Sequence, residues 1–144
     1  MQLALDQAKA AGSRGEVPVG AVVVAPGIDN VLARAGNQVQ ELNDPTAHAE
    51  ILAIRAATSK RNEQRLPDCD LYVTLEPCPM CAGAIIQSRI PRIVYGATDP
   101  KAGAVTSLYN LLTDTRLNHT VQVTGGVLAE DCGRILTNFF RSKR

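Results

Sequence analysis

Apolar and polar residues along this chain follow two different periods, which predict alternating helices and strands. Apolar side chains recur at helical spacing through residues 1–13, so we expect an amphipathic helix that stops at Gly12 and Gly15. The valine-rich stretch 17–24 and the weaker stretch 31–39 are typical of strands. Because only the turn-forming residues 26–30 separate them, the two strands are expected to form an antiparallel hairpin.

The rest of the chain predicts further helices and strands in alternation. Asp44, Pro45 and Thr46 supply cap residues and a first-turn proline, so a helix is expected over residues 44–60. The remaining expected elements are a strand at 71–76, a helix at 80–88, a strand at 93–96, a short helix at 107–112, a strand at 120–123 and a helix at 128–141. The helix at 107–112 would make the last two strands parallel. We therefore expect one α/β domain, residues 1–144, built as a three-layer α/β/α sandwich with a five-stranded mixed sheet.

Composition narrows the classes of function. Lys and Arg number 15 against 14 Asp and Glu, a net charge of +1, so any nucleic-acid contact must be local. Aromatic residues are only 3% of the chain, which argues against a sheet that stacks many bases. The first residues lack the basic region of a signal peptide, and no apolar run reaches the roughly 18 residues of a membrane span. We expect a cytoplasmic protein, with no membrane contact and with reduced cysteines.

Two short clusters, each at the start of a predicted helix, offer metal ligands. Cys78 and Cys81 are three positions apart, so their sulfurs share one helix face and can hold a single ion. His48 can supply a third ligand. Three protein ligands with an open position are typical of catalytic zinc, whereas structural zinc is closed by four. The pattern therefore predicts one catalytic Zn²⁺ per chain.

Glu50 lies two residues after His48 and is expected to act as a base and not as a ligand. In the middle of a helix the two side chains would point apart, but first-turn side chains spread around the helix axis. An ion above the helix N-terminus could then be contacted by His48, while Glu50 approaches the water beside it. Such a carboxylate can take a proton from that water.

Two other interpretations of the cysteine pair remain open at this point. A Cys-x-x-Cys sequence that follows a strand and opens a helix is also the thioredoxin-type redox arrangement, although that leaves His48 and Glu50 without a role. A purely structural zinc module would need a fourth ligand. Cys69, Cys132 and His119 lack a metal-type spacing, so we expect them to be ordinary surface or core residues.

Longer motifs carry a resemblance to a known family. His48-Ala49-Glu50 and Pro77-Cys78-Pro79-Met80-Cys81 resemble the signature of the zinc-dependent nucleoside deaminases. Residues 16–22, 44–50 and 71–84 are similar to bacterial tRNA-specific adenosine deaminases, a branch of the cytidine and deoxycytidylate deaminase superfamily. Further similar stretches are 88–90, 96–104, 117–119 and 139–141. The resemblance runs from the first helix to Phe140 and implies a cytidine deaminase-like fold.

The resemblance also implies an activity. Members of this family are homodimeric hydrolases that convert adenosine to inosine at the wobble position of a tRNA anticodon, with zinc-activated hydroxide and a glutamate proton shuttle. By position in the matching motifs, His48, Cys78 and Cys81 would hold zinc, and Glu50 would be the catalytic proton shuttle. The substrate contacts would come from six residues: Asn37 and the Ala49 backbone amide at the flipped base, and Asp99, Lys101, Asn118 and Phe140 along the anticodon stem-loop.

The residues expected to contact the substrate also have simpler structural explanations. Asn37 could simply end a strand, Asp99 and Lys101 could be turn residues, and Phe140 could be part of the core. Relatives on this fold deaminate free cytosine, guanine or pyrimidine intermediates, so zinc chemistry alone does not select RNA. A basic cluster at residues 141–144 could meet phosphates, although terminal basic runs are often just solvated.

Overall fold

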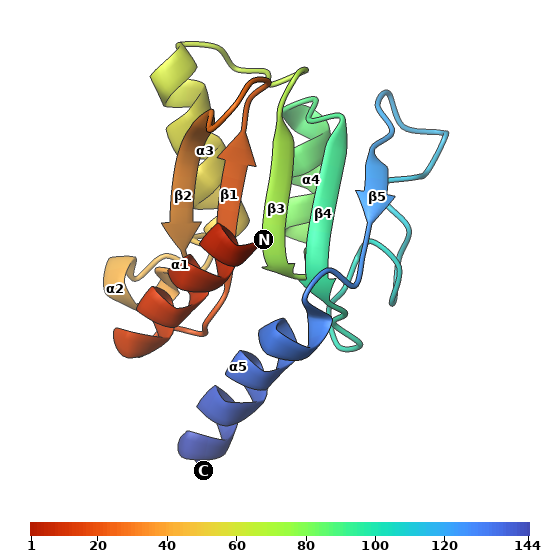
Figure 1. Cartoon of the computed structure of the whole chain (residues 1–144). Coiled ribbons are helices and arrows are strands. Elements are labelled where there is room, and N and C mark those ends of the chain that lie inside the picture. The colour runs from red at the N-terminus through yellow and green to blue at the C-terminus, as the bar shows by residue number, and fades with distance from the viewer.

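A five-stranded sheet with the strand order β2-β1-β3-β4-β5 lies between two layers of helices (Figure 1). The computed structural model describes residues 1–144. In chain order its elements are α1 (Gln2–Ser13), β1 (Gly20–Val24), β2 (Val31–Gly36), α2 (Val39–Leu42), α3 (Ala49–Arg61), β3 (Asp70–Leu75), α4 (Pro79–Gln87), β4 (Arg92–Ala97), β5 (Gln122–Thr124) and α5 (Ala129–Ser142). This is the predicted three-layer α/β/α sandwich. None of the helices combines the length and the apolar character needed to cross a membrane.

The strand directions bring distant parts of the chain to one edge of the sheet. β1 pairs antiparallel with both β2 and β3, whereas β3, β4 and β5 are parallel, which confirms the mixed sheet. The carboxyl ends of β2, β3 and β4 therefore meet at the amino end of β1. Residues 16–19, 37–40, 76–81 and 98–103 follow or precede those strand ends, so the sheet itself gathers them.

The two faces of the sheet are covered differently. Helices α3 and α4 lie behind the sheet in the view of Figure 1, and α1 and α5 lie in front. α1 approaches closely because the residues that face it are small: a side chain on Gly20 would come within 2.0 Å of the Ala4 carbonyl oxygen. Ala4, Ala8 and Ala11 are fully buried on the other side of this contact. α5 buries only Cys132 and extends past the lower end of the sheet.

The helix expected over residues 44–60 begins later, at Ala49. Asp44 does not cap it: the Asp44 carboxylate accepts hydrogen bonds from the Thr46 amide and hydroxyl and closes a separate turn. His48 occupies the N-cap position instead. The expected strand 17–24 is also shorter, because Pro18 has no amide hydrogen to donate and β1 begins at Gly20.

The short helix expected at 107–112 is absent, and the helix α2 was not expected at all. Residues 107–112 are irregular, because the amides of Val105, Thr106 and Ser107 at the start of this segment donate to the carboxylate of Glu76 and not to a helical ladder. The expected strand 31–39 ends at Gly36, and its last residue instead begins α2. Here the amides of Gln40 and Glu41 donate to Glu16. In both places a distant carboxylate decides the local structure.

Candidate metal centre and active-site cleft

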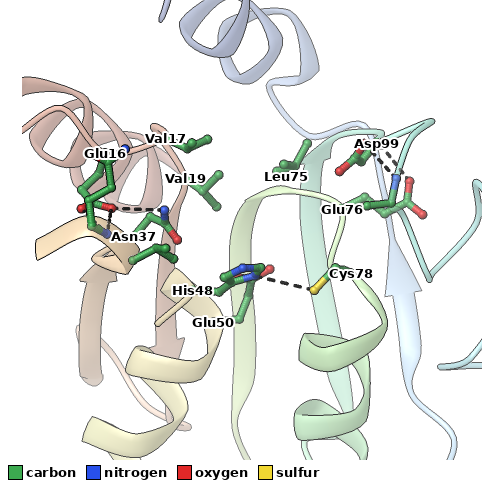
Figure 2. Close-up of a pocket in the computed structure, with 13 residues that line it drawn as sticks. Glu16, Val17, Val19, Asn37, His48, Glu50, Leu75, Glu76, Cys78 and Asp99 are labelled. Atoms are coloured by element: carbon green, nitrogen blue, oxygen red, sulfur yellow. Dashed lines mark hydrogen bonds between the residues drawn. The ribbon is translucent and has the colours of Figure 1, made fainter. Parts of the chain in front are cut away.

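His48, Cys78 and Cys81 come together at the gathered edge of the sheet (Figure 2). His48 is the N-cap of α3 and Cys78 is the N-cap of α4, with Pro79 in the first helical turn. His48 Nδ1 lies 3.6 Å from Cys78 Sγ and 3.5 Å from Cys81 Sγ. The three ligand atoms all lie within 4.8 Å of one another. Two helix N-termini thus face a single point, as the sequence predicted.

The electrostatics of the cluster favour the thiolate form of Cys78. Hydrogen bonds from the Cys81 thiol and from His48 lower the pKa of Cys78 to about 4, against the opposing effect of burial. The pKa of Cys81 is raised, because its proton is held by Cys78 and its side chain is buried. The hydrogen bond to Cys78 raises the pKa of His48. Helix N-termini act in the same direction at Cys78, since their partial positive charge stabilises an anion.

The donor set fits a zinc ion with one open position. One imidazole nitrogen and two sulfurs are ligands that zinc prefers, and two thiolates would balance its charge. Cys69 and Cys132 are buried in other parts of the fold, and His119 Nε2 lies 2.8 Å from the Ile90 carbonyl oxygen. None of these joins the three ligands. The arrangement therefore matches a catalytic site better than a closed structural one.

Glu50 lies beside His48 and Cys78 at the floor of the cleft (Figure 2). Its side chain points toward the same space although it is two residues from His48, because α3 begins between them. Only 4% of Glu50 is exposed, and this burial raises the pKa of its carboxyl group to about 7. A carboxyl group with a pKa near neutrality can both accept and release a proton at physiological pH.

The cleft above this floor has a volume of about 350 Å³, within the range of small-molecule pockets. Asn37 lies on one wall, opposite Leu75 and Cys78. Ala49 is the first residue of α3, so its backbone N–H has no acceptor within the helix and is free for a ligand. The walls are lined by Glu16, Val17, Val19, Asn37, Val39, Gln40, Leu75, Glu76, Asp99 and Ala102.

A second cleft of about 870 Å³ adjoins the first, and most of the residues expected to contact the anticodon stem-loop line it. Asp99 lines both clefts and also forms a turn, accepting hydrogen bonds from the amides of Lys101 and Ala102. Lys101 and Phe140 line the second cleft, and Phe140 is 49% exposed, so it is not a core residue. Asn118 is exposed between β4 and β5 and lines neither cleft. The basic cluster Arg141, Lys143 and Arg144 lines the second cleft as well.

Comparison with known proteins identifies the family. The family model of the MafB19-like deaminases matches residues 1–144. A tRNA-specific adenosine deaminase from Agrobacterium fabrum is 51% identical over 144 residues, which cover all of this chain and 93% of that protein. The chain belongs to the tRNA-specific adenosine deaminase family. Other members of that family, from Haemophilus and Bacillus, are 48% identical over the same length.

Solved structures place the tRNA-specific adenosine deaminase family within a wider fold. A structure from a study of A-to-I editing by tRNA:A34 deaminases superposes with a TM-score of 0.89 at 50% identity, covering 94% of this chain and 97% of that one. A guanine deaminase from Bacillus subtilis superposes with a TM-score of 0.64 at 31% identity, covering 98% of this chain and 90% of that one. The fold is therefore shared by proteins named for different bases, and fold alone does not select the substrate.

Two residues of the cleft were not singled out from the sequence. Glu16 and Glu76 are buried carboxylates, one on each wall, and each accepts several hydrogen bonds from a neighbouring loop. Neither was assigned a metal-type or catalytic role, and each lies within two residues of a proline, Pro18 or Pro77. The only available signal was the charge itself at a position that the flanking pattern predicts to be buried.

Proposed function

We propose that this chain catalyses the hydrolytic deamination of adenosine to inosine at the wobble position of a tRNA anticodon. The observation that carries the proposal is the buried Glu50 beside an open three-ligand cluster, at the floor of a cleft of about 350 Å³. The relatives named as tRNA-specific adenosine deaminases support the choice of base and of RNA. Together these point to an RNA-editing hydrolase.

Some residues of the cleft would hold the zinc and the base, and Glu50 would transfer protons. Zinc held by His48, Cys78 and Cys81 would supply a Lewis acid that lets water ionise near neutral pH. Glu50 takes a proton from the water that adds to C6 of adenine and delivers it to N1. It then moves the remaining hydroxyl proton to the amino group, so that ammonia leaves, inosine forms and Glu50 is ionised again. Asn37 and the Ala49 amide hold the base during these transfers.

The second cleft is proposed to hold the anticodon stem-loop. Its cations Lys101, Arg141, Lys143 and Arg144 are placed to meet phosphates, and Phe140 offers an exposed ring for stacking. A wobble base is already unpaired, so turning it into the first cleft costs less than opening a duplex. Asn118 lies outside these clefts of its own chain, and we propose that it contacts RNA bound to the other subunit of a cytoplasmic homodimer.

The proposal is tested by offering the protein two kinds of substrate. An anticodon stem-loop with adenosine at the wobble position is incubated with the enzyme in parallel with free adenosine, guanosine and cytidine. Inosine in the stem-loop, measured by nucleoside analysis after digestion, is the expected product. Turnover of a free nucleoside with no inosine in the stem-loop would instead identify a small-molecule deaminase.

Replacing the basic cluster should weaken RNA binding in a salt-dependent way. We expect the triple variant Arg141→Gln, Lys143→Gln, Arg144→Gln to bind the stem-loop less tightly. Each lost phosphate contact should reduce the slope of log K against log salt by about 0.7, so the total is up to about 2. The matched control replaces Lys9, Lys60 and Arg65, exposed cations that line neither cleft, and should keep the slope. Equal slopes in the two triple variants would exclude the basic cluster from the RNA-binding surface.

Truncating Phe140 should also reduce RNA affinity. A base stacked on this ring contributes on the order of 1 to 3 kcal/mol, so Phe140→Ala should bind the stem-loop about 5- to 150-fold more weakly. The neighbouring Phe139 contacts Phe140 edge to face at 5.4 Å but does not line the cleft. Phe139→Ala is therefore the control and should change affinity by about twofold at most. If Phe140→Ala lowers the melting temperature and leaves affinity intact, its ring serves packing alone.

A further inference from the structure

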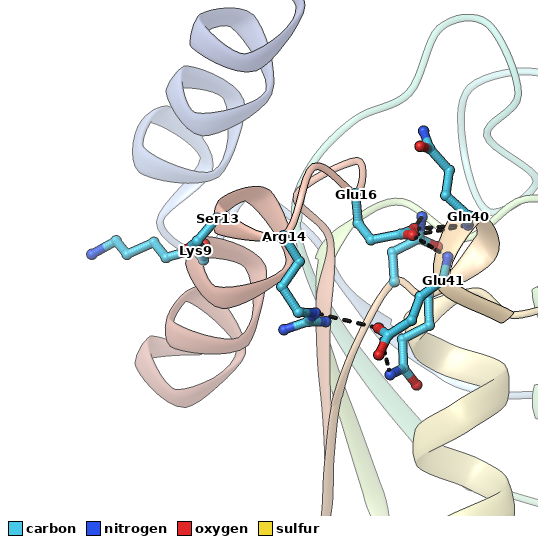
Figure 3. Close-up of polar contacts among 8 residues, drawn as sticks. Lys9, Ser13, Arg14, Glu16, Gln40 and Glu41 are labelled. Carbon is cyan, nitrogen blue, oxygen red and sulfur yellow. Dashed lines mark hydrogen bonds and ion pairs between the residues drawn. The ribbon is translucent and has the colours of Figure 1, made fainter.

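Glu16 is a buried carboxylate that accepts hydrogen bonds from backbone amides and from the side chain of Asn37, which lines the cleft. Only 1% of the residue is exposed, and it lies in the loop between α1 and β1. Its Oε1 accepts hydrogen bonds from the amides of Gln40 and Glu41, each at 2.8 Å (Figure 3). Its Oε2 accepts from Asn37 Nδ2 at 3.4 Å and also from the Gln40 amide at 3.3 Å. Oε1 therefore accepts from the backbone alone, whereas Oε2 also accepts from the Asn37 side chain.

The contact with Asn37 decides which way its amide points. A carboxylate can only accept hydrogen bonds, so the amide of Asn37 must turn its nitrogen toward Glu16. Figure 2 shows the result: the nitrogen faces Glu16 and the oxygen faces the cleft. Asn37 is 8% exposed and lines the cleft, so few other groups compete for it. The polarity that the cleft offers to a base is thus set by a residue on another loop.

We propose that Glu16 is a positioning residue, which fixes the amide orientation of Asn37 and thereby the hydrogen-bonding pattern that the cleft presents to the base of its substrate. The inference rests on the proposed function for the role of Asn37 at the base. It concerns a residue that needs no contact with the substrate itself. Glu16 acts on the reaction only through Asn37.

The substitution Glu16→Gln separates this role from anchoring of the backbone. A glutamine keeps one oxygen, which can still accept from the amides of Gln40 and Glu41 and hold α2 in place. Its new NH₂ group takes the place of Oε2 and favours the opposite orientation of Asn37, with the Asn37 oxygen accepting from it. The fold and the metal content should therefore persist, while the amide presented to the base is reversed.

Glu41 offers a matched control. It belongs to the same cluster, where its carboxylate pairs with Arg14 at 3.5 Å and accepts from Gln38 (Figure 3). It is exposed and its side chain does not contact Asn37. Glu41→Gln makes the same chemical change in the same cluster of polar contacts. We expect it to leave the kinetics of stem-loop deamination within about twofold of the unchanged enzyme.

The test combines kinetics with a direct view of the amide. Glu16→Gln should raise KM for the wobble-adenosine stem-loop at least about tenfold with little change in kcat, because a binding contact is lost. In an Asn37→Ala background the same substitution should add less than about twofold. In ¹H–¹⁵N spectra of the protein without RNA, the side-chain amide signal of Asn37, assigned by its loss in Asn37→Ala, should shift in Glu16→Gln and stay in place in Glu41→Gln.

Three results would overturn the inference. The Asn37 signal could stay unchanged in Glu16→Gln, the kinetic defect could persist in full without Asn37, or Glu16→Gln could fail to fold, which would make its carboxylate a structural anchor only. If the unchanged enzyme forms no inosine, the proposed function fails instead. The amide spectra would still decide whether Glu16 orients Asn37.

Discussion

Glu50→Gln is expected to lower the rate of inosine formation by at least about 10²- to 10⁴-fold, which is the contribution of a positioned acid or base. Glutamine keeps the size and the buried position of the side chain but cannot take a proton from water. The change therefore removes the proton transfers to N1 and to ammonia and leaves the cleft intact. Single-turnover measurements on the wobble-adenosine stem-loop would give the rate directly.

The metal content of the same variant distinguishes a base from a ligand. Because His48, Cys78 and Cys81 form the cluster without Glu50, the variant should keep about one zinc per chain by elemental analysis and bind the stem-loop as before. Loss of zinc from this variant would show that Glu50 is a metal ligand. A variant that retains normal turnover would refute the mechanism.

The second large effect is expected at the cysteines. Cys81→Ala should abolish inosine formation and reduce bound zinc from about one per chain to near zero, because two protein ligands cannot replace three. Cys81 is fully buried at the start of α4, and its Sγ lies 3.5 Å from His48 Nδ1. Elemental analysis and stem-loop turnover, measured on the same preparation, check both parts of this expectation.

Cys69→Ala is the matched control for this experiment. Cys69 is also fully buried, and its sulfur accepts from Arg61 and contacts Asp68 away from the cluster. This variant should keep its zinc and its activity. If the enzyme instead works without metal while Cys78 and Cys81 cycle through a disulfide, the redox interpretation of the Cys-x-x-Cys sequence is correct and the deaminase mechanism fails.

The candidate metal cluster could be predicted from the sequence because its signals are local. His48 and Glu50 lie two residues apart, Cys78 and Cys81 lie three apart, and both pairs begin helices, so neighbours along the chain decide their relative placement. The sheet was predictable for a similar reason, since the apolar pattern that predicts each strand lies within the strand itself. What joins the two halves of the cluster is the strand order, which places β3 beside β1 and which the sequence pattern alone did not predict.

The features that the sequence did not predict depend on contacts between distant residues. The helix α2 is stabilised by Glu16 more than twenty positions earlier, and the turns at 105–107 are stabilised by Glu76 about thirty positions earlier. Local propensity favours a strand in the first case and a helix in the second. A buried carboxylate that accepts several amides outweighs these preferences, because each charged hydrogen bond contributes more than the propensity difference of a residue.

The hydrogen bonds to the Glu76 carboxylate limit where residues can be inserted into this chain. It accepts hydrogen bonds from Asp99 at one end of a loop and from Val105, Thr106 and Ser107 at the other. A residue inserted between positions 99 and 107 would pull at least one of these donors away from a buried charge. In the connection at 113–117 the carboxylate of Asp114 accepts only from the nearby Arg116, and no donor of this segment reaches Glu76. Insertions, tags or grafted peptides on this side of the molecule therefore belong at 113–117, before the proposed RNA contact Asn118, where the loop can lengthen without pulling a donor away from Glu76.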